Sequence, residues 1–377
     1  MPSHDTVRAP SQGRTLRARI DLGRIVANAH RLKARSGGLG FLAVVKADAY
    51  GHGAIPCARA LEADGVAAGF CVATLGEGVE LRAAGLRLPI QVFAGPRPED
   101  LPLAAAHRLD LTLTSPAQLP AFLDLLPAHP TGVHVELDTG MGRSGLQLPE
   151  LGACLEGLRR LQPQLRGVMS HLASADEPDL ASAHRQAAAF AGAVAALRAD
   201  GLTFPTVHLA NSAGCLRGFT AGTTQVRCGI ALYGLADLPE SREAGLAPAL
   251  ELLAEVIRVA QVPAGTSVGY GGTFVAPEPL TLATLNCGYA DGYPRALANR
   301  AWALHQGVPR PVVGRISMDA ITVALPAGAE VRPGDTMVVL SADEAAPNSV
   351  VRTADLLGTI SYEVTCALHR RVVREPA

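Results

Sequence analysis

The feature that most constrains the fold is a regular alternation, through the first two thirds of the chain, of short apolar runs with longer stretches of helical period. Apolar runs rich in β-branched residues predict buried strands, and the Ala-, Leu- and Arg-rich stretches between them predict helices. The predicted strands are 41–46, 69–74, 89–93, 111–114, 133–138, 167–171, 206–211 and 224–229, with helices such as 25–35, 149–161 and 180–199 between them. Eight such units predict a (β/α)₈ TIM barrel, in which functional groups lie at the C-terminal ends of the strands.

A doubly wound sheet is the alternative to the barrel. It is less favoured because no GxGxxG sequence follows the first predicted strand. Near 237–248 the helical period fades, and short strands punctuated by Gly and Pro follow. These strands are 252–262, 280–286, 302–305, 311–316, 320–325, 337–340 and 364–371, with one short helix near 351–357. The sequence therefore predicts a barrel over 22–240 and a smaller, mostly β domain over 241–377, with which 14–21 could also pair.

The composition excludes several classes of function. Hydrophobic residues make up 48% of the 377 residues and charged residues 18%, which is enough apolar material for a large core. The net charge of −1 provides no basic field that would attract a nucleic acid or an anionic membrane. A small-molecule substrate is therefore the expected partner.

The cysteines and the apolar runs bear on the cellular location. The seven cysteines are odd in number, and no two have CxxC spacing, so we expect neither a disulfide framework nor a metal site. Residues 1–19 are polar and Arg-rich, without the apolar core of a signal peptide. The apolar run 187–197 is too short to span a bilayer. These features predict a cytoplasmic protein.

Lysine is rare in this chain, and its rarity limits the chemistry. Of the 33 basic residues only Lys33 and Lys46 are lysines, and arginine cannot form an imine. Lys33 lies in an amphipathic helix and is expected at the surface. Lys46 ends the strand FLAVVK and precedes a glycine-bracketed turn, where a barrel places catalytic groups. Taken alone, Lys46 could equally be a strand-end lysine that reaches solvent.

Other predicted strand ends also carry polar groups. They are Glu136, Arg143, His171, Asn211, Ser212, Arg227 and Gly229. Each has an ordinary structural explanation: His171 could be a hydrogen-bonded core residue, Arg143 a surface ion pair and Ser212 a helix cap. Several such groups at one end of a barrel together indicate an active site.

Eight segments resemble the alanine racemases. They are AVVKADAYGHG, LDTGMGRSG, HLANSAG, RCGIALYG, GYGGTF, GYADGYPR, GRISMD and SYEVTC, and they follow the family's order over nearly the whole chain. The resemblance implies a pyridoxal-phosphate-dependent racemase with a barrel and a β domain, which interconverts L-alanine and D-alanine and supplies D-alanine for peptidoglycan.

The resemblance also implies how the cofactor is held. Lys46 would form the imine with pyridoxal phosphate, and Arg227 would face the pyridine nitrogen. The phosphate would be held by Tyr50, Ser212, Gly229, Ile230 and Tyr362. A glycine turn whose backbone N–H groups converge suits a phosphate dianion.

The same resemblance implies the remaining roles. Tyr270 would be the second acid/base and would come from the other subunit of a homodimer with shared active sites. Arg143 and the backbone of Met318 would receive the substrate carboxylate. His171 would orient Arg227 and Tyr270, while Tyr289 and Asp319 would shape the entrance. Removal of the α-proton from one face and its return on the other explains why two acid/base groups are needed.

Two positions depart from the family pattern. Many members have a carbamylated lysine where this chain has Glu136, seven residues before Arg143. We hypothesise that Glu136 orients Arg143 by a charge-assisted hydrogen bond, without a need for carbon dioxide. Cys228 replaces the proline that usually precedes GIALYG, and we expect no catalytic role for it.

Three other functions remain open at this stage. The first is a broad-specificity, serine or lysine racemase of the same fold. The second is an amino-acid decarboxylase, although a decarboxylase usually has a carboxylate where Arg227 would stand. The third is a non-catalytic vitamin B6 carrier, which the complete β domain with Tyr270 argues against because a carrier needs no second acid/base.

Overall fold

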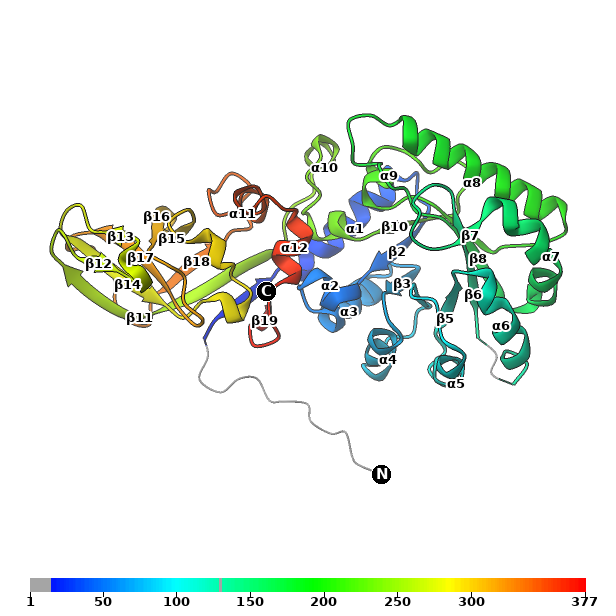
Figure 1. Ribbon diagram of the computed structural model, residues 1–377, viewed down its shortest axis with the longest axis horizontal. Coiled ribbons are helices and arrows are strands. Elements are labelled where there is room, and N and C mark those ends of the chain that lie inside the picture. Colours follow the sequence, from blue (N-terminus) through cyan, green and yellow to red (C-terminus); the bar gives the residue numbers. More distant parts are fainter. Residues whose placement is uncertain (1–14, 129–130) are drawn as a thin grey trace, which may run out of the picture. The chain divides into compact units, whose positions relative to one another are not determined.

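The computed structural model describes residues 15–128 and 131–377, and these form two compact units (Figure 1). One unit, the barrel unit, is Gly23–Ala247. The other, the β unit, is Pro248–Ala377 together with the N-terminal segment that ends at Leu22. Residues 1–14, which include Arg14 of the predicted segment 14–21, lie outside the described residues.

The barrel unit contains a closed ring of eight parallel strands. They are β2 (Gly40–Val44), β3 (Gly69–Val72), β4 (Ile90–Val92), β5 (Asp110–Leu113), β6 (Val133–Asp138), β8 (Leu165–Met169), β9 (Thr206–His208) and β10 (Gln225–Cys228). The ring closes because β10 pairs with β2, with Val226 opposite Phe41. The strands are buried almost throughout, as expected for parallel strands covered on both faces. The predicted TIM barrel is confirmed.

Helices surround the strands of the barrel (Figure 1). They are α1 (Leu22–Arg35), α2 (Lys46–Tyr50), α3 (Ala54–Asp64), α4 (Leu75–Ala83), α5 (Leu101–Ala106), α6 (Leu119–Leu125), α7 (Leu151–Arg160), α8 (Ala181–Ala199), α9 (Ser212–Leu216) and α10 (Pro239–Glu243). Helix α1 shows the cause of this arrangement, since its buried residues Ile25, Ala29 and Leu32 follow the helical period on one face. A short strand, β7 (Leu146–Gln147), pairs with the end of β6.

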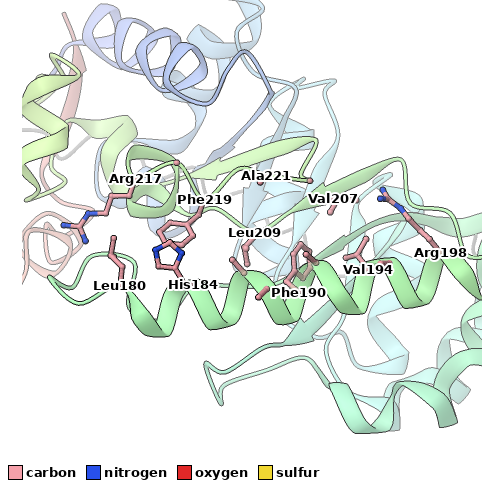
Figure 2. A pocket seen from close by; sticks show the side chains of 16 residues that line it. Leu180, His184, Phe190, Val194, Arg198, Val207, Leu209, Arg217, Phe219 and Ala221 are labelled. Carbon is pink, nitrogen blue, oxygen red and sulfur yellow. The ribbon is translucent and has the colours of Figure 1, made fainter.

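An apolar cavity of about 460 Å³ lies beside α8. In Figure 2 the side chains of α8 face Val207 on β9, Leu209 directly after β9, and Phe219 in the turn after α9. The alanines of α8 leave this space open because they are too small to fill it. The cavity is not lined by any residue that the sequence marks as catalytic.

The β unit is built on a second closed ring, which is antiparallel. Its strands are β11 (Leu250–Val262), β14 (Leu280–Leu285), β17 (Ile321–Pro326), β16 (Val308–Val313), β15 (Trp302–His305) and β18 (Thr336–Leu340). The long strand β11 closes the ring by pairing with β14 through its C-terminal half and with β18 through its N-terminal half. Strand β1 (Arg17–Ile20) extends this sheet, pairing with β11 on one side and with β19 (Val373–Pro376) on the other.

One predicted strand of the β unit is wrong. Residues 364–371 do not form a strand: the helix α12 (Ser361–Cys366) covers the first of them, and turns follow. The buried residues of α12 are Ser361, Val364 and Thr365, whose spacing places them on one face of a helix. The nearby helix α11 (Val350–Leu357) agrees with the prediction, and the last strand begins later, at Val373.

Candidate active site

A cavity of about 310 Å³ opens at the C-terminal ends of the barrel strands. It collects side chains that the sequence places far apart: Lys46 after β2, Glu136 on β6, Arg143 in the loop after β6, His171 after β8 and Arg227 on β10. Phe93 lies close to two of these cations: its ring centre is 5.9 Å from Lys46 Nζ and 5.6 Å from Arg227 Cζ. Five predicted site residues therefore share one cavity in the barrel unit.

The backbone after Lys46 has an unusual conformation. Ala47, Asp48, Ala49 and Tyr50 all have φ between 52° and 55°, which makes α2 a left-handed turn of non-glycine residues. Such a conformation costs about 1–2 kcal/mol per residue. Hydrogen bonds hold it: Gly51 N–H donates to Ala47 O (3.0 Å) and Gly53 N–H to Asp48 O (2.8 Å). The turn joins the predicted imine-forming Lys46 to the predicted phosphate ligand Tyr50.

Arg227 is buried and fixed by three acceptors. Its guanidinium donates to His208 Nδ1 (2.7 Å), to His171 Nδ1 (2.9 Å) and to Ser170 O (3.0 Å). Burial lowers the pKa of Arg227, and the nearby Cys71 and Glu136 oppose that effect. These three hydrogen bonds fix the orientation of Arg227, which also lines the cavity.

The two histidines that receive these hydrogen bonds are neutral. Burial, followed by the positive charges of Arg227, Arg143 and Lys46, holds the pKa of His171 well below its usual 6.5. Burial and Arg227 likewise lower the pKa of His208. A neutral ring can accept through Nδ1, which is what both hydrogen bonds from Arg227 require. The sequence did not identify His208, because a histidine inside a strand carries no distinguishing pattern.

Asp138 holds the loop that carries Arg143. Its carboxylate accepts from the backbone N–H groups of Gly140 (2.9 Å), Met141 (2.9 Å) and Gly142 (3.0 Å), and from Gln147 Nε2 (2.9 Å). Burial alone would raise the pKa of Asp138, but these hydrogen bonds outweigh it and lower the pKa. The sequence analysis missed this residue, although an aspartate that directly precedes a glycine-rich turn is a recognisable signal.

Glu136 is buried next to the same loop. Its Oε2 accepts from Ser144 Oγ at 2.9 Å, so the hydroxyl beside Arg143 is the hydrogen-bond donor to this carboxylate. Burial raises the pKa of Glu136, whereas the Ser144 hydrogen bond and the charges of Arg227 and Arg143 oppose the rise. Arg143 therefore acts on Glu136 through its charge.

Tyr50, Ser212, Gly229 and Ile230 meet on one side of the barrel mouth. Ser212 Oγ accepts from Gly229 N–H (3.0 Å) and from Ala231 N–H (3.2 Å), on either side of Ile230. A Cβ atom at position 229 would lie 2.3 Å from Tyr50 Oη, so glycine is required there. Four of the five predicted phosphate ligands thus lie together, with hydroxyl and backbone N–H groups converging.

The other predicted residues belong to the β unit. Tyr270 lies in a turn between Gly269 and Gly271, both of which have φ of 72°, and its side chain is 70% exposed. Tyr362 is exposed on α12. Both residues therefore lie at the surface of the β unit, outside its buried core.

Tyr289, Met318 and Asp319 lie in two loops that contact each other. Tyr289 N–H donates to Ser317 O (3.1 Å), and Ala290 N–H donates to Met318 O (3.0 Å). Arg371 links the same loops, since its guanidinium donates to Asp319 and to Asp291. Tyr289 and Met318 remain exposed, so the β unit presents these two predicted residues at its surface.

Within 15–128 and 131–377 no group of three or more His, Cys, Asp and Glu residues could hold a metal ion. No helix in these ranges is both long and apolar enough to cross a membrane. All seven cysteines are in the thiol form.

Comparison with known proteins gives consistent matches. Residues 20–237 match the family model described as alanine racemase, N-terminal domain, and residues 249–376 match alanine racemase, C-terminal domain. The chain is 42% identical to the alanine racemase of Syntrophobacter fumaroxidans over 93% of this chain and 94% of that protein. It is 41% identical to that of a Synechocystis species over 88% and 91%. The crystal structure of alanine racemase from Streptomyces lavendulae matches with a TM-score of 0.90, at 33% identity over 97% of this chain and 98% of that chain.

Proposed function

Since the chain belongs to the alanine racemase family, whose reaction interconverts L-alanine and D-alanine, we propose that Lys46 and Tyr270 carry the two proton transfers of that reaction. The observation that supports this most is the barrel-mouth cavity, which collects Lys46, Arg143, His171 and Arg227 in a chain that matches the family over both domains. No observation on the described residues favours a broad-specificity, serine or lysine racemase over an alanine racemase.

The residues present fit pyridoxal phosphate. A cavity that contains a lysine suits an aldehyde, which reacts with a primary amine, and the buried guanidinium of Arg227 suits the pyridine nitrogen. Tyr50, Ser212, Gly229 and Ile230 are proposed to hold its phosphate, since the hydroxyls of Tyr50 and Ser212 lie beside the backbone of Gly229, and Tyr362 is proposed as the fifth ligand. When bound, the cofactor delocalises the negative charge that develops at the substrate α-carbon.

Inversion at the α-carbon needs one group that removes the proton and another that returns it to the opposite face. We assign Lys46 Nζ to one face and Tyr270 Oη to the other. Lys46 shares its cavity with Arg227 and Arg143. Tyr270 is suited to its role because the residue is 70% exposed on the β unit.

Arg227 sets the strength of the cofactor as an electron acceptor. Its NH groups are hydrogen-bonded to neutral His171 and His208, neither of which can supply a proton to it. An arginine is a poor proton donor, so a pyridine nitrogen held against Arg227 would stay unprotonated. The bound cofactor would then be a weaker electron acceptor, which would limit side reactions such as transamination.

Substrate orientation depends on the carboxylate. Arg143 in its Asp138-braced loop and the backbone of Met318 are proposed to bind it, with Glu136 as the buried counter-charge. Tyr289 and Asp319 are proposed to shape the entrance. Because Lys46 and Tyr270 lie in different units, we propose a cytoplasmic homodimer in which each subunit supplies Tyr270 to the other, and which provides D-alanine for peptidoglycan.

The decisive measurement is chiral analysis of L-alanine incubated with the purified protein and pyridoxal phosphate, with Lys46→Ala as control. The enantiomers have equal free energy in an achiral solvent, so a racemase drives the mixture to a ratio near one. We expect that ratio with the wild type and no D-alanine with Lys46→Ala. Bound cofactor without D-alanine formation would reject the assignment to alanine.

A further inference from the structure

Glu77 makes an unassigned contact with the residue that follows Lys46. From this contact we propose that Glu77 is a positioning residue, which holds the left-handed turn 47–50 and thereby aims Lys46 into the cavity. The inference rests on the proposed function of Lys46, and it adds a residue that neither the motifs nor the cavity lining single out.

The geometry is specific to a carboxylate. Glu77 lies in the first turn of α4, and its Oε1 accepts from Ala47 N–H at 2.7 Å. Its Oε2 accepts from Ala73 N–H at 2.8 Å and from Thr74 N–H at 3.0 Å. One side chain therefore ties the loop after β3 to the backbone that directly follows Lys46. Ala73 itself lines the cavity, so both anchored segments border the site.

The turn needs such an anchor because it is sterically disfavoured. Four consecutive non-glycine residues with positive φ persist only when their surroundings fix them. The far end of the turn is fixed by Asp48 Oδ1, which accepts from Ala54 N–H at 2.7 Å. Glu77 fixes the near end, next to Lys46. Loss of this contact would release the turn at the residue where the orientation of Lys46 is set.

An ordinary helix cap is the competing explanation. Thr74 Oγ1 accepts from Glu77 N–H at 3.3 Å, and Glu77 returns a bond to Thr74 N–H, which together form a capping box. In that box only Oε2 is used, whereas the contact with Ala47 uses Oε1. Glutamine has one acceptor oxygen and one NH₂ donor, so it can cap the helix or hold Ala47, but not both.

The test compares Glu77→Gln with two matched changes on the same helix. Thr74→Ala removes the cap and leaves the Ala47 contact, and Glu80→Gln alters an exposed carboxylate one turn further along.

Four quantities are measured: kcat, KM for L-alanine, the dissociation rate of pyridoxal phosphate followed by its visible absorbance, and amide hydrogen exchange in the peptide that spans 46–54. We expect Glu77→Gln to lower kcat and to speed cofactor loss by about tenfold or more, the effect of one hydrogen bond to a charged group. Exchange in 46–54 should also become faster.

A rescue experiment distinguishes positioning from capping. Glycine adopts positive φ without a steric cost, so Ala47→Gly should restore part of the kcat and cofactor retention lost in Glu77→Gln. Capping alone predicts no rescue, because position 47 has no part in the cap. If Glu77→Gln does not fold, the same comparison is made with Glu77→Asp, which keeps the charge but shortens the reach.

The outcomes are distinguishable from those of the main proposal. If the wild type racemises alanine while Glu77→Gln matches Glu80→Gln in every readout, Glu77 has no positioning role. Equal effects of Glu77→Gln and Thr74→Ala, without rescue by Ala47→Gly, would also overturn the inference. Failure of the proposed function would appear instead as an inactive wild type.

Discussion

Burial and positive charge decide the protonation states at the barrel mouth, residue by residue. Lys46, Arg143 and Arg227 surround the cavity, and the two histidines beside Arg227 remain neutral because a further positive charge there is unfavourable. Glu136 is the buried carboxylate that faces this positive field. A site of this kind attracts an anionic amino acid carboxylate and a phosphate.

The first prediction concerns Glu136. We expect Glu136→Gln to raise KM for L-alanine about tenfold, or roughly 1.4 kcal/mol, while the affinity for pyridoxal phosphate changes much less. The reason is that the carboxylate acts on Arg143 and its neighbour Ser144, which belong to the substrate side. Steady-state kinetics and cofactor titration measure the two effects, with exposed Glu150→Gln as control. An unchanged KM would count against the role of Glu136.

The second prediction is a loss of stability in mild acid. His171 and His208 have folded-state pKa values well below 6.5, so below pH 6.5 the unfolded chain takes up protons that the folded chain does not. Stability is therefore complete above that pH and falls as the pH decreases. Each histidine contributes at most about 1.4 kcal/mol per pH unit.

Thermal unfolding between pH 5 and pH 8 measures this effect. His208→Gln removes one of the two groups and should flatten the pH dependence below 6.5. Its Tm at pH 8 should nevertheless be lower, because Arg227 loses the ring Nδ1 that accepts its hydrogen bond. His107→Gln, at a half-buried histidine away from the cavity, is the control and should keep the wild-type slope. A slope that is the same in all three proteins would contradict the prediction.

At the residue scale, the sequence predicts the groups that line the cavity but not the residues that hold them in place. Lys46, His171 and Arg227 stand at strand ends in recognisable motifs, and the structure places all three at one cavity. Glu77 contacts Ala47, which is 30 positions away in the sequence, and His208 contacts Arg227, which is 19 positions away. Such contacts depend on which strands and loops become neighbours in the fold, and a local sequence pattern does not predict this.

The elements differ in how well local sequence determines them. The periodic barrel strands and α8 were predicted closely because burial on a regular period leaves a strong pattern. The left-handed turn α2 was not predicted, since KADAY contains no glycine and nothing in it favours positive φ. Helix α12 was assigned to a strand because its six residues are too few to show a helical period.

The loop after β6 provides the third prediction. Asp138→Asn leaves a single acceptor oxygen for the three backbone N–H groups and Gln147 that the carboxylate now satisfies. The loop that carries Arg143 should loosen, and we expect KM for L-alanine to rise about tenfold to a hundredfold. Gln147→Ala removes one of these hydrogen bonds and should show a smaller rise. If both variants keep the wild-type KM, the loop does not orient Arg143.

At the scale of the whole molecule, the two proposed acid/base groups belong to different units. The change of texture near 237–248 indicated the second domain, and the closed antiparallel ring follows that stretch. Periodicity reports only which face of an element is buried, so it cannot show whether Tyr270 acts in its own subunit or in a second one. The exposure of Tyr270 on the β unit is compatible with the donation of its hydroxyl to a second chain.

Mixing two inactive variants tests that donation. Lys46→Ala retains Tyr270, and Tyr270→Phe retains Lys46, so each homodimer lacks one acid/base in both sites. If the tyrosine comes from the partner, a mixed dimer pairs the intact Lys46 of one subunit with the intact Tyr270 of the other in one of its two sites. Random exchange of subunits then makes about one quarter of all sites active.

The alternative gives a different result from the same experiment. If Lys46 and Tyr270 of one chain form the site, every site in a mixed dimer still lacks one of them, and mixing restores no racemisation. The two variants are denatured together, refolded with pyridoxal phosphate and assayed by chiral analysis, and each variant refolded alone gives the baseline. Recovered activity should also fall on dilution with the half-life of subunit exchange, because a shared site exists only while the dimer does.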